Sequence, residues 1–191
     1  VQAALHRSTQ VIGLGEEVAI PDSVNHPLLQ GVDGILIYAR PNERDLELCQ
    51  AIQSLGIPIV MIDRFYPQLD CDYVIFDEEV AASELTRHLI RRGHKRIALL
   101  THYELNASSI YNRIAGYQRA LEEYGRYDDR LLWFDVYSEL HVSKGQIGNK
   151  QMTQMLRERI EEYEPTAVFC VNHDVAERVN YDLMLINAER A

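Results

Sequence analysis

The sequence lacks any apolar run approaching about 18 residues, the length that a membrane-spanning helix needs. Cysteines are also few: Cys49, Cys71 and Cys170 are an odd number without paired spacing, so neither a disulfide framework nor a zinc site is indicated. We therefore expect no membrane segment and a reducing, cytoplasmic setting. No signal peptide follows Val1, and the chain does not begin with Met.

Basic charge is scarce as well. The chain has 19 Lys and Arg residues against 29 Asp and Glu, which gives a formal net charge of -10. Binding to DNA phosphates needs a basic surface, so this chain is not expected to hold DNA itself. Any DNA partner is expected to be held by a segment outside it.

Motifs of the common enzyme classes are missing too. Gly13-Leu14-Gly15 begins like a dinucleotide loop, but Val18 replaces the required glycine, and the acidic pair Glu16-Glu17 would repel a pyrophosphate. Gly148-Asn149-Lys150 lacks the other parts of a phosphate-binding loop. His88 has no ligand-like partner at helical spacing. We expect no catalytic residue, cofactor or metal.

Alternating strands and helices are what the sequence does contain. With 191 residues and 47% hydrophobic composition, the chain is an ordinary globular α/β protein. Glycines at 31, 56 and 93 each precede an apolar run, as expected where a helix ends in a left-handed cap before a parallel strand. Strands are predicted at 11–14, 32–38, 57–62, 74–76, 96–101, 131–136 and 166–171, and helices at 1–8, 43–55, 78–92, 110–121, 145–163 and from 173 to about 187, with a brief helical turn within 21–30.

The stretch from Gly93 to Leu121 organises the rest. A buried strand leads to a polar loop and a helix, and ligands of open α/β sheets bind at such carboxyl-end loops. Ser108 or Ser109 is expected to cap this helix, and Asp77 is expected to cap the helix at 78–92. Arg113 lies in or near the first turn, where the helix dipole disfavours a cation, so it is either a functional residue or a solvated arginine.

Six pieces of sequence, in order, resemble the effector-binding core of the lactose-repressor/galactose-repressor (LacI/GalR) transcription regulators. They span residues 32 to about 176: Val32–Ile37, Ile57–Arg64, Asp77 with Ala81, His88–Ile90, Gly93–Ala98 followed by Ser109–Tyr117 and Ala120–Leu121, and Pro165–Asn172. The resemblance implies a doubly wound, mostly parallel, periplasmic-binding-protein-like fold. Its two lobes are expected at residues 1–76 and 77–191, with the first strand and the last strands missing.

The resemblance also assigns candidate ligand contacts. Arg113, Asn172 and Ser109 are expected to supply polar contacts, and Asp63, Arg64 and Tyr66 to form a second wall. Tyr137, or alternatively Trp133, is expected to stack on the ligand. Asp63 and Arg64 could instead pair with each other, and Tyr137 could pack a loop. Asp174 is a possible helix cap, and His173 departs from the family, which has an aspartate there.

These features imply an effector-sensing domain that binds a sugar or similar metabolite in an interlobe cleft. The resemblance places DNA binding in an N-terminal helix-turn-helix outside this chain and implies a homodimer. The alternative is a periplasmic sugar-binding protein of a transport system, and an enzyme on the same fold is a weaker rival.

Overall fold

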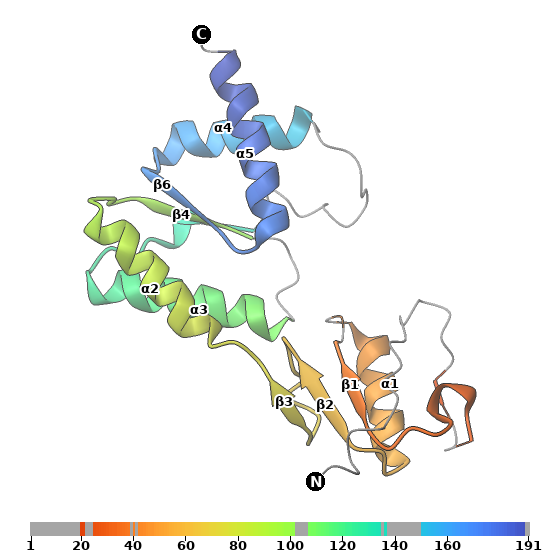
Figure 1. Ribbon diagram of the computed structural model, residues 1–191. Helices are drawn as coiled ribbons and strands as arrows, with labels where there is room; N and C mark the ends of the chain where they lie inside the picture. The colour runs from red at the N-terminus through yellow and green to blue at the C-terminus, as the bar shows by residue number, and fades with distance from the viewer. Residues whose placement is uncertain are drawn as a thin grey trace, which may run out of the picture.

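The computed structural model describes residues 20–21, 25–38, 40, 42–101, 107–134, 136 and 150–189. Within them the chain forms two three-stranded sheets, in the orders β1-β2-β3 and β5-β4-β6. Every strand pairing is parallel. The predicted α/β class with parallel sheets is therefore confirmed, and Figure 1 shows each sheet with its own helices.

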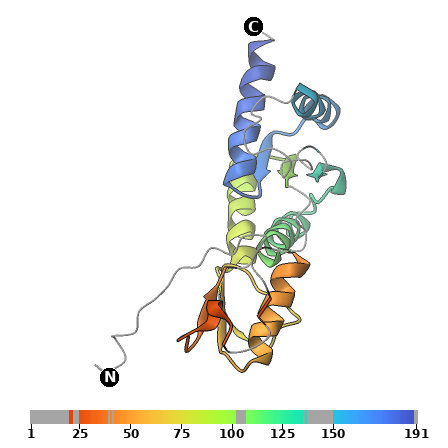
Figure 2. The same ribbon diagram turned by 90° about the vertical axis from the view of Figure 1, so that its right-hand side faces the viewer.

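The first sheet is covered by one described helix. It contains β1 (Ile35–Ile37), β2 (Ile59–Ile62) and β3 (Asp72–Val74), and α1 (Glu43–Ser54) packs on one face. A short 3-10 helix, Pro27–Leu29, precedes β1. Ile37 and Met61 are buried beneath α1 in one apolar cluster with Leu48 and Ile52. Figure 2 shows α1 along that side.

The opposite face of this sheet corrects one prediction. The continuous apolar run at residues 32–38, predicted as a strand, is typical of a strand covered on both faces, but the strand is limited to Ile35–Ile37, and Leu36 is 65% exposed. Alternate side chains of a strand point to opposite faces, and no described helix lies over the Leu36 side. The apolar run therefore reflects a sheet that is only half covered by the described residues.

The second sheet is covered on both faces. Strand β4 (Ile97–Leu100) is central between β5 (Leu132–Trp133) and β6 (Ala167–Cys170), and all four of its residues are buried. Helices α2 (Glu78–Arg91) and α3 (Ser108–Glu123) lie on one side in Figure 1, and α4 (Lys150–Tyr163) and α5 (His173–Ala188) on the other. A single apolar core joins all of these helices to the sheet.

Helices α2 and α3 lie unusually close at one glycine. A Cβ atom added to Gly116 would lie 2.1 Å from the carbonyl oxygen of Glu79 and 3.0 Å from the Cβ of Ala82. Only glycine allows this approach, so Gly116 sets the distance between the two helices.

The structure confirms most of the caps predicted at helix ends and contradicts one of them. Asp77 caps α2, accepting from the Val80 N–H at 3.1 Å. The glycines expected in left-handed caps have positive φ: 69° at Gly31, 75° at Gly56 and 95° at Gly93. The predicted cap of α3 is wrong, because the helix begins at Ser108 with Ala107 at the cap position and no side-chain cap bond.

Several element boundaries also differ. The strand expected at 74–76 is Asp72–Val74, because its register is set by pairing with β2. The strand expected at 131–136 is only Leu132–Trp133, since a 3-10 turn, Asp129–Leu131, takes up its start. The predicted elements at 1–8, 11–14 and 145–149 lie outside the described residues.

Candidate functional site

The carboxyl ends of the two sheets are joined by a hydrogen bond. The backbone N–H of Phe65, in the loop after β2, donates to the hydroxyl oxygen of Ser108 at 3.1 Å. Ser108 is the first residue of α3, which follows β4. Because all strands are parallel, the loops after β2 and β4 both leave carboxyl edges, so these edges adjoin.

Arg113 reaches the carboxyl end of β6. Its Nη1–H donates to the carbonyl oxygen of Val171 at 2.7 Å, and Val171 immediately precedes Asn172. The guanidinium is therefore held one residue from the backbone of Asn172. The side chain of Arg113 is 26% exposed, so it is not the freely solvated arginine of the simpler interpretation.

Glu78 holds the guanidinium in place and was not singled out from the sequence. Arg113 donates from Nε to one carboxylate oxygen at 2.6 Å and from Nη2 to the other at 2.7 Å. Glu78 is the first residue of α2, and its side chain is 9% exposed. A bidentate pair of this kind fixes the plane of the guanidinium as well as its position.

The electrostatics of Arg113 involve both sheets. Hydrogen bonding to Glu78 is the largest influence and raises the pKa of Arg113, against the lowering caused by desolvation. The negative charges of Glu78 and Asp63 raise this pKa further. Asp63 follows β2, so a group from the first sheet acts on an arginine carried by the second.

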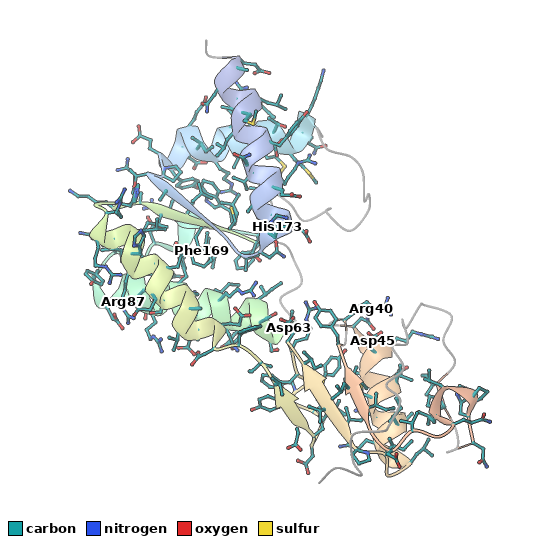
Figure 3. The ribbon with its side chains drawn as sticks, viewed as in Figure 1. Arg40, Asp45, Asp63, Arg87, Phe169 and His173 are labelled. Carbon is teal, nitrogen blue, oxygen red and sulfur yellow. The ribbon has the colours of Figure 1, made fainter. Side chains whose placement is uncertain are left out.

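Asp63 and Arg64 form an ion pair with each other. This pairing is the alternative to a role in ligand binding that the sequence left open. Arg64 Nε lies 3.4 Å from Asp63 Oδ2, and Arg64 Nη2 donates to the Tyr38 hydroxyl at 3.0 Å. Asp63 has a φ of 71°, an uncommon backbone conformation for a residue other than glycine. Figure 3 shows Asp63 at the end of its sheet nearest α3.

Tyr66 ties two loops of the first sheet together. Its hydroxyl donates to the carbonyl of Arg40 and lies 3.3 Å from the carbonyl of Asn42. Burial is the main cause that raises the pKa of Tyr66 to about 12, so the hydroxyl stays protonated as a donor. The ring is only partly buried in the apolar cluster of the first sheet.

The structure places the remaining candidate residues in different surroundings. Asn172 caps α5 through a 2.9 Å bond from the Val175 N–H, so the helix is not capped by Asp174, which lies in the first turn. Ser109 is in the first turn of α3 and 5% exposed. Tyr137 lies outside the described residues. Trp133, its alternative, is 1% exposed in the core, which makes a stacking role for that ring wrong.

A hollow lies at the amino edge of the first sheet, away from these candidate residues. Its volume is about 430 Å³, and its lining includes Ile59, which begins β2, and Asp72, which begins β3. Ligands of open α/β sheets bind outside the carboxyl ends, so this amino-end hollow is a poorer candidate.

The described residues offer neither a metal-binding cluster nor a membrane-spanning helix. No cluster of three His, Cys, Asp or Glu side chains able to hold a metal ion occurs among those residues. The described helices include none with the length and apolar character to cross a membrane.

Comparison with known proteins gives consistent results. Residues 6–182 match the family described as periplasmic binding proteins and the sugar-binding domain of the LacI family. The chain is 33% identical to the maltose regulon regulatory protein MalI of Escherichia coli K12 over 153 residues, covering 78% of this chain and 41% of MalI. It is 30% identical to the HTH-type transcriptional regulator DegA of Bacillus subtilis 168 over 146 residues, covering 76% of this chain and 40% of DegA.

A solved structure of the transcriptional regulator CelR with cellobiose superposes with a TM-score of 0.61 at 25% identity, over 84% of this chain and 45% of CelR. The chain thus spans about 40% of the length of the curated relatives it matches.

Proposed function

The chain belongs to the family of periplasmic binding proteins and LacI-type sugar-binding domains, and we propose that it is the effector-sensing part of a DNA-binding transcriptional repressor. Its ligand is a sugar or a similar small metabolite, bound between lobes at residues 1–76 and 77–191. The observation that carries this proposal is the position of Arg113, which is fixed at the end of β6 and under the electrostatic influence of Asp63 from the other sheet.

The binding surface consists of groups at the two carboxyl edges. Arg113, Asn172 and Ser109 offer donors and acceptors on one side, and Asp63, Arg64 and Tyr66 on the other. Tyr137 supplies an aromatic face for the sugar ring. A few polar groups in fixed directions, with an aromatic face beside them, suit the hydroxyls and the apolar face of a sugar.

Regulation follows from the two-lobed arrangement. A ligand that contacts both edges favours the lobe arrangement in which both contacts are made, and it shifts the population only by its difference in affinity for the two arrangements. We propose that a homodimer relays this shift to an N-terminal helix-turn-helix outside the chain, in the cytoplasm. Binding of this kind needs no catalytic residue, and we propose no enzymatic activity.

The regulator is favoured over the transport protein by the names of the relatives. MalI and DegA are named as a regulatory protein and a transcriptional regulator. CelR, another regulator, is solved with a sugar, cellobiose. The net charge of -10 is consistent with a domain that leaves DNA contact to another segment.

Gel-shift and calorimetric measurements on the full-length protein test the proposal. We expect it to bind DNA from its own promoter region, and we expect a neutral sugar from a panel of pentoses, hexoses and disaccharides to change that affinity. Protein that binds sugar but no DNA would support the transport alternative. Protein whose DNA binding responds to no small metabolite would contradict a sensing role.

A further inference from the structure

The arginines at the carboxyl edges already have carboxylate partners. Arg113 is paired with Glu78 through two hydrogen bonds of 2.6 and 2.7 Å. Arg64 lies 3.4 Å from Asp63, and Arg40, in the loop after β1, donates to Asp45 at 2.9 Å. Figure 3 shows Arg40, Asp45 and Asp63 at the same end of the first sheet. Each of these three arginines thus has a carboxylate partner.

The Arg113 pair is the tightest of these. The Nε and Nη2 groups of an arginine commonly bind a phosphate or carboxylate as a fork, through two parallel hydrogen bonds. In Arg113 both of these groups donate to Glu78. Nη1 is directed at the carbonyl oxygen of Val171. An anionic ligand approaching this arginine would therefore meet the fork already occupied and the charges of Glu78 and Asp63 nearby.

Uncharged hydroxyl groups face no such penalty. A sugar hydroxyl donates to a carboxylate oxygen and accepts from a guanidinium N–H, so it can bind beside a paired arginine without displacing its partner. A phosphate ester or a sugar acid at the same place brings like charges together, and specific sites use such repulsion to reject competitors.

We propose that the ligand is an uncharged polyhydroxylated compound, a free sugar or polyol, and that Glu78 is the residue that excludes its phosphorylated and carboxylate analogues. Glu78 both positions the guanidinium of Arg113 and cancels its charge. This inference rests on the proposed function, because it concerns the ligand of that same site.

Inorganic phosphate is the simplest probe of the inference. We expect roughly 10 mM phosphate, at constant ionic strength, to leave the Tm of the full-length wild-type protein unchanged. In the Glu78→Gln variant the fork of Arg113 is released, and the same phosphate is expected to raise the Tm by about 3 °C. The matched control is Glu79→Gln, which removes the same charge from the next residue of α2, where Glu79 pairs with the exposed Arg119 at 2.5 Å. The control should not respond.

Two results would overturn the inference. One is a phosphate-induced rise in Tm in the wild-type protein that Arg113→Ala abolishes, and this result does not depend on the variant at position 78 being folded. The other is an equal response to phosphate of folded Glu78→Gln and Glu79→Gln proteins.

A panel of matched ligands separates this inference from the proposed function. Calorimetry compares glucose with glucose 6-phosphate and gluconate, and ribose with ribose 5-phosphate. We expect a parent sugar that binds to do so about 10-fold or more tightly than its anionic analogue. Preference for the anionic analogue overturns the role of Glu78 but leaves a metabolite-sensing function standing. DNA binding that no member of the wider panel of pentoses, hexoses and disaccharides alters contradicts the proposed function itself, whatever the phosphate result.

Discussion

The backbone N–H of Phe65 donates to the hydroxyl of Ser108, 43 residues further along the chain, at 3.1 Å. This bond joins the loop after β2 to the start of α3 and so connects the carboxyl edges of the two sheets. Ser108 was expected to cap its own helix, but its hydroxyl serves the other sheet instead. The contact is a direct link between the two halves of the candidate site.

Removal of this hydrogen bond is expected to lower the free energy of unfolding. Ser108→Ala leaves the partly buried Phe65 N–H without that acceptor, and we expect a loss of about 1 kcal/mol in the free energy of unfolding. Urea denaturation measures it. Ser54→Ala is the control, because the Ser54 hydroxyl only donates to the Gln50 carbonyl on an exposed helix surface. Equal, negligible effects in both variants would argue that the bond contributes nothing.

Gly116 is expected to be intolerant of even a methyl group. Alanine in a helix normally gains up to about 1 kcal/mol over glycine, but here its Cβ would lie 2.1 Å from the Glu79 carbonyl oxygen. The helices must then move apart, so Gly116→Ala should destabilise by about 1–3 kcal/mol.

Gly34→Ala is the matched control for this substitution. The added Cβ meets its nearest neighbour, the Pro58 carbonyl oxygen, at an ordinary 3.5 Å. Thermal unfolding of the two variants measures the difference, and a Gly116→Ala protein as stable as wild type would mean that α2 and α3 are not packed as described.

Asn172 has two separable roles. Its side chain caps α5, and we propose that it also contacts the ligand. Asn172→Ser should keep the cap, because serine is a comparable N-cap residue, so stability should change by less than about 0.5 kcal/mol. The shorter hydroxyl should fail to reach the ligand and weaken binding several-fold. Unchanged calorimetric affinity in this stable variant would remove Asn172 from the site.

Asp45 makes stability dependent on pH at the acid end. Burial raises its pKa, but hydrogen bonds from Arg40 and Asn42 outweigh that influence, and the net pKa lies below its usual value. A lowered pKa in the folded state stabilises the fold above the unfolded value of about 3.9, and this contribution is lost as the pH falls below it. The urea midpoint of Asp45→Asn should therefore be lower than that of wild type at pH 6, and the gap should narrow below pH 4. A gap independent of pH would contradict this assignment.

The sequence predicted the features that depend on neighbouring residues. Gly31, Gly56 and Gly93 mark left-handed caps, and Asp77 caps α2, because each signal is contained within one turn. Glu78 was missed because an acidic residue in a first helical turn is already favoured by the helix dipole and needs no further explanation. Its pairing with Arg113 arises from tertiary packing 35 residues away.

Long-range packing also explains why the exposure of Leu36 and the burial of Trp133 differ from what the sequence predicted. The exposure of Leu36 depends on which elements cover the sheet, and the burial of Trp133 depends on the core beneath β5. Neither can be read from the local hydrophobic pattern, which reports only that a residue suits a pleated, partly buried surface.

Calorimetric titration of full-length Arg113→Ala with the panel sugar that binds wild type most tightly tests the central claim most directly. We expect affinity to fall by about 10 to 100 fold, because a hydrogen bond from a charged group contributes about 1.5 to 3 kcal/mol. Arg119→Ala, from the exposed face of the same helix, should bind as wild type does. Unchanged affinity in a folded Arg113→Ala protein would contradict the claim that the ligand lies between the two carboxyl edges against this guanidinium.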